Sequence, residues 1–150
     1  MSQVGTVNDL DQALGYLLKQ AATTLRGAMD AALRPLDLTV PQYACLELLG
    51  RRPGLSNAAL ARGAFVTRQS MNLVLRGLQD RGLVTRPAQA ASGRELPTQL
   101  TPAGLDKLHA ASVAVQAVER RMVTTLTVDA RRQLRDHLTA CVAALTDEPD

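Results

Sequence analysis

The segment from Thr67 to Gly82 carries hydrogen-bonding side chains on one side and apolar side chains on the other. Its apolar residues repeat at the i, i+3, i+4, i+7 spacing of a helix that buries one face, and they are Met71, Val74, Leu75 and Leu78. Its polar side holds Arg68, Gln69, Asn72 and Arg76, flanked by Ser70 and Leu73. Arginine pairs with guanine, and asparagine or glutamine pairs with adenine, in the major groove of DNA. The pattern therefore predicts a recognition helix, with an ordinary amphipathic surface helix as the alternative.

Two capping residues predict how this helix is mounted. Ser56 is a good N-cap for a short helix from Asn57 to about Gly63, and Thr67 is a good N-cap for the helix that ends at Gly82. Two helices joined by a tight turn form a helix-turn-helix. The first turn of the second helix would offer free backbone N–H groups to phosphates.

A short β-hairpin is expected directly after this pair of helices. Residues 83–86 and about 95–100 favour extended structure, and a polar loop separates them. Such a hairpin would form a wing. Arg94 lies near its tip, where an arginine can enter a narrow minor groove, and Arg86 is better placed for a phosphate. A plain surface role is the alternative for Arg94.

Charge is concentrated in the same central block. Residues 51–94 hold eight arginines and one acid, a net charge of +7, whereas residues 1–50 and 95–150 each carry a net charge of −2. A chain whose excess positive charge is confined to its middle is typical of a module that binds a polyanion, although a solvated basic face is the simpler alternative.

Long apolar stripes flank the central block. The first helix is expected to begin near Asp9 as its N-cap and to end at Pro35, and a second helix should run from Pro41 to about Arg51. Thr101-Pro102 and Thr127 should begin the last two helices. The terminal helices are too apolar to stay uncovered, so we expect a homodimer. The expected interface residues are Leu10, Leu14, Leu17, Leu126, Leu134, Leu138, Cys141 and Leu145.

Little else in the sequence indicates chemistry. His109 and His137 lie on separate helices without other metal ligands at suitable spacing, so no metal or cofactor is expected. We find no nucleophile–base pair, phosphate loop or paired carboxylates, which argues against an enzyme. No apolar run of the length that spans a membrane and no secretory signal occurs, so a cytoplasmic protein without a membrane partner is expected.

Three motifs resemble the MarR family of transcription regulators. Leu38–Leu46 resembles the family pattern LT-x-x-Q-[FY]-x-x-L, Leu78–Val84 resembles L-x-x-[RK]-G-L-[VI], and Leu100–Gly104 resembles LT-x-x-G. The resemblance covers about residues 10 to 145. It implies a homodimer that binds a pseudo-palindromic operator, often as a repressor, and that a small anionic or phenolic compound releases. The effector cleft of the family lies near the helices that carry Tyr16 and Tyr43.

Two positions depart from the family pattern. Ser92 stands where the family usually has an Asp that helps to hold the wing arginine, here Arg94. Leu73 stands where a polar or basic residue is frequent. Either it contacts a thymine methyl group, or this position reads bases more weakly or differently than in the family. The redox-sensing branch of the family uses a cysteine near the start of the chain, whereas the first cysteine here is Cys45, within an apolar helix.

The sequence thus predicts a mostly α-helical, winged helix-turn-helix protein with one domain over residues 1–150. Residues 9–36 and 103–146 would form dimerisation helices, and residues 41–100 would form the module that binds double-stranded DNA. The expected DNA contacts are Ser56, Asn57, Arg62, Thr67, Arg68, Gln69, Ser70, Asn72, Leu73, Arg76, Arg86 and Arg94. Two alternatives stay open: a helical homodimeric scaffold for protein interactions whose winged module is degenerate, and a cysteine-based redox sensor.

Overall fold

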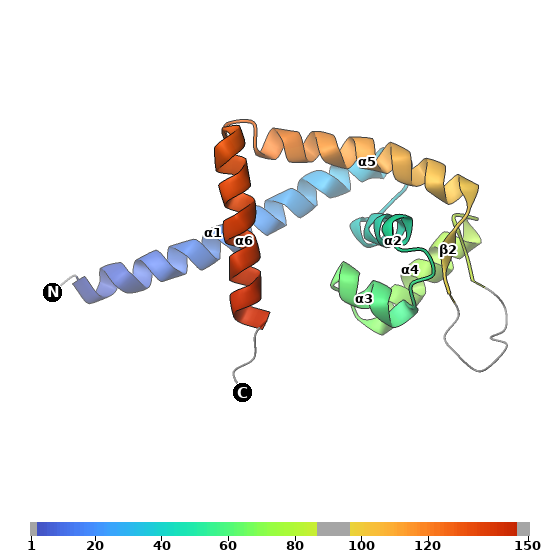
Figure 1. Cartoon of the computed structure of the whole chain (residues 1–150), viewed down its shortest axis with the longest axis horizontal. Helices are drawn as coiled ribbons and strands as arrows, with labels where there is room; N and C mark the ends of the chain where they lie inside the picture. The colour runs from blue at the N-terminus through green and yellow to red at the C-terminus, as the bar shows by residue number, and fades with distance from the viewer. Residues whose placement is uncertain (1–2, 87–96, 147–150) are drawn as a thin grey trace. The chain divides into compact units, whose positions relative to one another are not determined.

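A computed structural model describes the backbone of residues 3–86 and 97–146, and side chains within these ranges from residue 13 onward (Figure 1). The elements are α1 (Gln3–Leu33), the 3-10 helix η1 (Arg34–Leu36), α2 (Val40–Arg51), α3 (Asn57–Ala64), α4 (Arg68–Asp80), β1 (Val84–Thr85), β2 (Gln99–Leu100), α5 (Pro102–Met122) and α6 (Val128–Thr146). Contacts group the residues up to Val118 into one unit and those from Glu119 into a second. The mostly helical fold with a two-stranded wing is as predicted.

Side-chain caps begin the central helices where the sequence predicted them. The Oγ atom of Ser56 accepts a hydrogen bond from the Ala59 N–H at 3.2 Å, and that of Thr67 accepts one from the Ser70 N–H at 3.0 Å. These bonds satisfy N–H groups that have no partner within the first helical turn. Both helices of the helix-turn-helix therefore begin at a side-chain cap that the sequence predicted.

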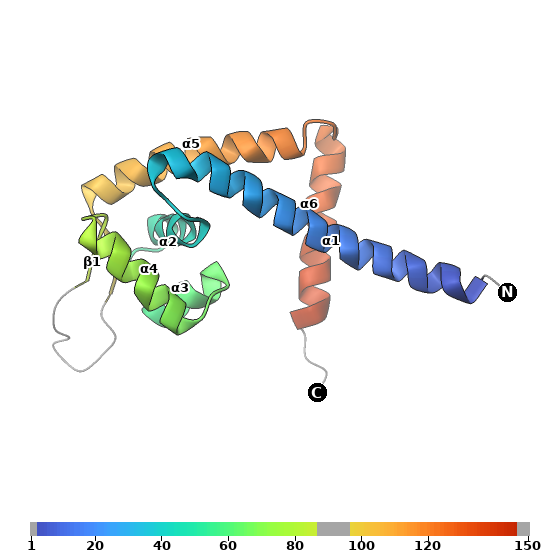
Figure 2. The same ribbon diagram turned by 180° about the vertical axis from the view of Figure 1, so that it is seen from behind.

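The end of α4 is fixed by the predicted terminator. Gly82 has φ +72°, a left-handed conformation that glycine adopts without steric cost. The Leu83 N–H donates to the Leu78 carbonyl at 2.9 Å, and the Gly82 N–H donates to the Gln79 carbonyl at 3.0 Å. Both bonds together form a Schellman motif, which turns the chain out of α4 and into β1 (Figure 2).

The wing is anchored to the start of α5. Strands β1 and β2 pair antiparallel, with Val84 opposite Leu100. The Thr101 hydroxyl donates to the Gly82 carbonyl at 2.6 Å and accepts from the Gly104 N–H at 3.0 Å. A Cβ atom on Gly104 would lie 1.9 Å from the Leu83 carbonyl oxygen, so only glycine allows this approach. This geometry explains the Thr and Gly of the LT-x-x-G motif.

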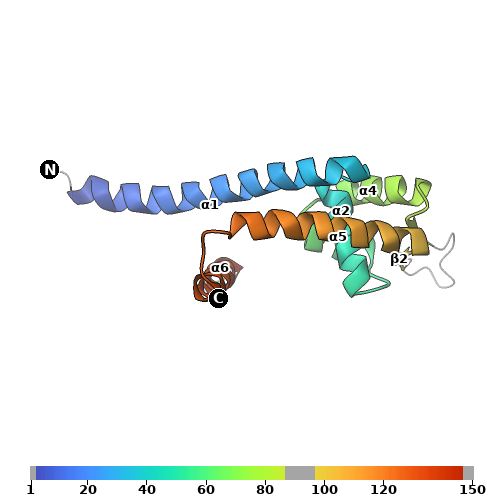
Figure 3. The same ribbon diagram turned by 90° about the horizontal axis from the view of Figure 1, so that it is seen from above.

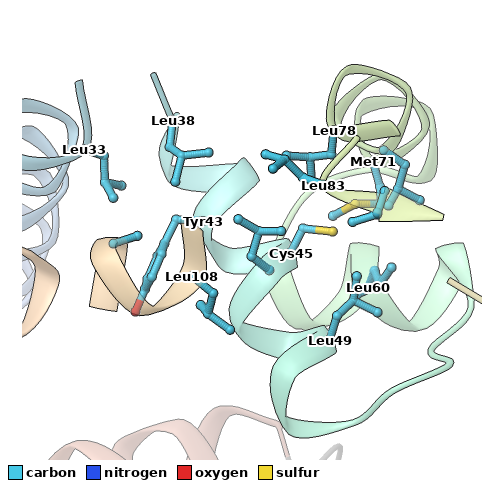
Figure 4. Packing of buried hydrophobic residues seen from close by; sticks show 14 of the residues in the cluster. Leu33, Leu38, Tyr43, Cys45, Leu49, Leu60, Met71, Leu78, Leu83 and Leu108 are labelled. Atoms are coloured by element: carbon cyan, nitrogen blue, oxygen red, sulfur yellow. The ribbon is translucent and has the colours of Figure 1, made fainter. Parts of the chain in front are cut away.

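One apolar cluster holds α2 between α5 on one side and α3 and α4 on the other (Figures 1 and 3). Figure 4 shows Cys45 and Leu49 of α2 facing Leu60 and Met71 across the cluster, while Leu33 and Leu108 reach it from α1 and α5. The predicted core face of α4 is confirmed at three positions, since Met71, Leu75 and Leu78 are fully buried. Its fourth member, Val74, is half-buried.

Two boundaries differ from the sequence prediction. Helix α1 begins at Gln3, so Asp9 lies inside the helix and is not its N-cap. Residues 3–8 contain no proline, and nothing in them stops the helix. Helix α2 begins at Val40, because Thr39 caps it and Gln42 bonds back to the Thr39 N–H to form a capping box.

The second unit consists mainly of α6. The Thr127 Oγ atom accepts from the Ala130 N–H at 3.1 Å, which confirms the predicted N-cap. The Arg131 Nε atom donates to the carbonyls of Val123 and Leu126 at 3.2 and 3.1 Å. These bonds order the turn before α6, whose side chains are almost all exposed.

Candidate nucleic-acid interface

The first two turns of α4 present an exposed, hydrogen-bonding surface. The exposed residues of this surface are Arg68, Gln69, Asn72, Leu73 and Arg76. Within the described parts of the chain, the side chains of the four polar residues form no hydrogen bond or ion pair with another residue. Their donors and acceptors are therefore available for a ligand outside the chain.

Leu73 interrupts this polar surface with an apolar side chain. It is 65% exposed although it is a large aliphatic residue. An aliphatic side chain in the middle of a reading surface is suited to the methyl group of thymine.

Four of the predicted contact residues also hold the helices in place. Ser56 and Thr67 are the N-caps, and the Thr67 hydroxyl also donates to the Ser70 Oγ at 3.0 Å. The Asn57 Nδ2 donates to the Arg68 carbonyl at 3.4 Å and links α3 to the first turn of α4. The Asn57 Oδ1 is buried without a hydrogen-bond partner in the described structure. These residues set the position of α4 relative to α3.

The remaining predicted contacts lie outside α4. Arg62 is exposed on α3, and Arg86 is half-buried directly after β1. Arg94 and Ser92 fall in residues 87–96, which lie outside the described residues.

The charges on this side of the molecule are poorly compensated. Among the described side chains, those of residues 13–86 and 97–146, Arg51 with Glu47 is the only ion pair, with an Nη2–Oε1 distance of 2.9 Å. No described acidic side chain pairs with the arginines of α3 and α4, which favours contact with a polyanion.

The two tyrosines expected near an effector cleft have different surroundings. Tyr43 is 9% exposed, and its hydroxyl donates to the Glu47 Oε2 at 2.5 Å. Tyr16 is 67% exposed and borders a hollow of about 260 Å³ whose other lining residues, such as Lys19 and Thr23, also come from α1. That hollow has no wall from α2, so the structure does not bring the two tyrosines together in it.

The terminal helices carry uncovered apolar residues, as the expected interface requires. Leu14 and Leu17 of α1 are 63% and 56% exposed, and Leu145 of α6 is 88% exposed. The other described members are exposed or half-buried: Leu126, Leu134, Leu138 and Cys141. The side chain of Leu10 lies outside the described residues.

Sequence reasoning missed Phe65, in the turn between α3 and α4. It is 94% exposed and has φ +59°, at the C-cap of α3. A bulky residue in this conformation is unusual, because the left-handed cap position favours glycine or asparagine. The signal was present in the sequence as an aromatic residue within the predicted tight turn.

The described residues contain no group of three or more His, Cys, Asp or Glu side chains that could hold a metal ion. None of the helices in the described ranges is long and apolar enough to cross a membrane.

Comparison with known proteins gives concordant matches. A sequence model of the MarR family matches residues 36–95. The HTH-type transcriptional repressor Rv2887 of Mycobacterium tuberculosis is 46% identical over 125 residues, which cover 83% of this chain and 90% of the relative.

Crystal structures of Rv2887 have the same fold. The complex with DNA superposes with a TM-score of 0.73 at 42% identity and covers 85% of this chain and 96% of that one. The complex with salicylic acid superposes with a TM-score of 0.71 at 45% identity and covers 85% and 95%. With this identity over most of both chains, the protein belongs to the MarR family of transcription regulators.

Proposed function

We propose that the protein is a sequence-specific DNA-binding transcription regulator that acts as a homodimeric repressor. The observation that carries this proposal is the exposed face of α4, where Arg68, Asn72 and Arg76 have no partners in the described chain. Side-chain hydrogen-bond donors that are unpaired on an exposed helix can bond to the edges of bases in a major groove.

In this mechanism the N-terminal half of α4 enters the major groove. Arg68 and Asn72 would contact base edges, while Arg86 and the first turns of α3 and α4 would contact phosphates. Arg94 would reach the adjacent minor groove from the wing. The relative Rv2887, a repressor crystallised with DNA, supports this assignment.

A dimer would supply the second reading head. The uncovered leucines of α1 and α6 support dimerisation through residues 9–36 and 103–146, which leaves residues 41–100 for DNA. Two heads related by a two-fold axis would bind half-sites about one helical turn apart, or a multiple of it.

A small anionic ligand would release the protein from DNA. Rv2887 has been crystallised with salicylic acid and with p-aminosalicylic acid. We extend this to an aromatic carboxylate as the effector class of the present chain.

Binding to the DNA upstream of the chain's own coding sequence tests the proposal. Fluorescence anisotropy or a gel shift should detect sequence-dependent binding that weakens steeply between 50 and 200 mM salt, because arginine–phosphate contacts release counterions, by about 10³-fold or more for six or more contacts. Binding that is insensitive to salt and sequence would instead favour a protein-interaction scaffold.

A further inference from the structure

A groove of about 510 Å³ lies on the outer side of α3, against the end of α2. Leu48, Leu55 and Ala59 provide an apolar floor, and no residue of the described DNA-reading face of α4 lines it. Its volume lies within the range of about 300–1,000 Å³ that is usual for small-molecule sites. We call it the basic groove because of its remaining lining residues.

Three guanidinium groups border the basic groove, from Arg51, Arg52 and Arg62. None of the described residues that line it is acidic. The nearby Glu47 is already engaged, since it accepts from the Arg51 Nε and Nη2 at 3.2 and 2.9 Å and from the Tyr43 hydroxyl. Arg52 and Arg62 have no acidic partner among the described residues, so the groove keeps an uncompensated positive charge that is complementary to an anion.

The same bonds order one of the three arginines. Tyr43 is buried and holds Glu47, and Glu47 holds Arg51 at the rim of the groove. An arginine held in one orientation loses less conformational freedom when it binds a carboxylate. The bonds to Glu47 therefore favour one orientation of Arg51, whose side chain is 76% exposed and within reach of a ligand.

Phe65 provides an aromatic wall at a conformational cost. Its ring is almost fully exposed to solvent, and its backbone is in the left-handed region. Each of these features is energetically unfavourable for phenylalanine when no ligand covers the ring. Backbone strain of this kind is concentrated at functional sites. The groove is also shaped by Gly63, where a Cβ atom would lie 2.8 Å from Leu48 Cδ1.

We propose that the basic groove binds a small aromatic carboxylate, with the carboxylate on Arg51 and Arg62 and the ring against Phe65. The consequence of this binding, release of the operator, rests on the proposed function. Arg62 is also one of the predicted DNA contacts, so a ligand that engages it would compete directly with the operator. The site is separate from the hollow beside Tyr16.

Calorimetric titration of the full-length protein with sodium salicylate, and with benzyl alcohol as a neutral analogue, tests the site. Salicylate should bind and benzyl alcohol should not. Arg51→Met should weaken salicylate binding about tenfold, as expected for loss of a charge-assisted bond. Phe65→Gly should weaken it similarly and should also raise Tm, because glycine relieves the strained φ. The rise in Tm separates loss of the ligand from loss of the fold.

Arg120→Met, at an exposed arginine outside the groove, is the matched control and should bind salicylate as the unchanged protein does. The proposal would be overturned by any of three results: both groove variants bind salicylate with wild-type affinity, Arg120→Met weakens binding as much as they do, or the unchanged protein does not bind salicylate. Phe65→Gly with weaker DNA binding and unchanged salicylate affinity would overturn it in favour of DNA as the occupant. Operator binding measured without ligand tests the proposed function separately.

Discussion

At the scale of the residue, burial decides the chemistry of Cys45. The side chain lies inside the apolar cluster, and desolvation raises the pKa of its thiol from 9.0 to about 12. Because the thiolate is the reactive form, the reactive fraction at pH 8 is on the order of 10⁻⁴. We therefore predict that a Cys141→Ser variant reacts with an aromatic disulfide reagent only after denaturation. Rapid labelling of the native variant at pH 8 would reopen the redox-sensor hypothesis.

Two glycines are predicted to respond in opposite directions to the same substitution. Gly104→Ala places a Cβ 1.9 Å from the Leu83 carbonyl oxygen and should lower the free energy of unfolding by roughly 1–3 kcal/mol. Gly77→Ala, inside α4, meets nothing closer than the Gln42 Nε2 at 3.7 Å and should raise it by roughly 0.5–1 kcal/mol. Urea unfolding of both variants checks this pair. If the two substitutions changed the free energy of unfolding equally, α5 and the wing would be able to move apart around the new Cβ atom without loss of stability.

At the scale of the element, α4 and the wing are predicted to contribute differently to DNA recognition. Arg68→Ala or Asn72→Ala should lose roughly 1–3 kcal/mol of discrimination at one base position in each half-site. Arg86→Ala should weaken binding to all sequences alike and reduce the salt slope by about one. Competition binding with single-base operator variants measures both quantities. A changed base preference in Arg86→Ala would assign that residue to base reading.

The sequence could predict these elements because their ends depend on local chemistry. Ser56, Thr67 and Gly82 act within a few residues of themselves, and the structure confirms all three as caps or terminators. The bonds of Glu47 to Tyr43 and Arg51 are also local, since each joins residues four apart within α2. The exposure of Phe65 depends on how the turn between α3 and α4 packs, which helical periodicity does not encode. The exposure of the predicted α4 face is observed, whereas its contacts with DNA remain predictions.

At the scale of the whole molecule, charge and apolar surface are divided along the chain. The central block of net charge +7 contains α3 and α4, whereas the uncovered leucines lie on α1 and α6. A basic centre serves a polyanion, and apolar helices that stay exposed require a partner surface. The position of the leucines was predictable from their spacing, but how two copies would pair in the proposed dimer depends on packing that the spacing does not encode.

Dimerisation is therefore predicted to be necessary for operator binding. Leu138 is 39% exposed on the apolar face of α6, so Leu138→Asp would bury an unpaired carboxylate in the interface. Sedimentation at micromolar concentration should show a dimer for the unchanged protein and a monomer for Leu138→Asp. Thr139→Asp adds the same charge at the adjacent exposed position and should remain a dimer. Because a monomer offers one reading head, Leu138→Asp should also lose the dependence of binding on half-site spacing. A stable monomer of the unchanged protein, or a monomeric Leu138→Asp that still distinguishes half-site spacing, would contradict the two-headed mechanism.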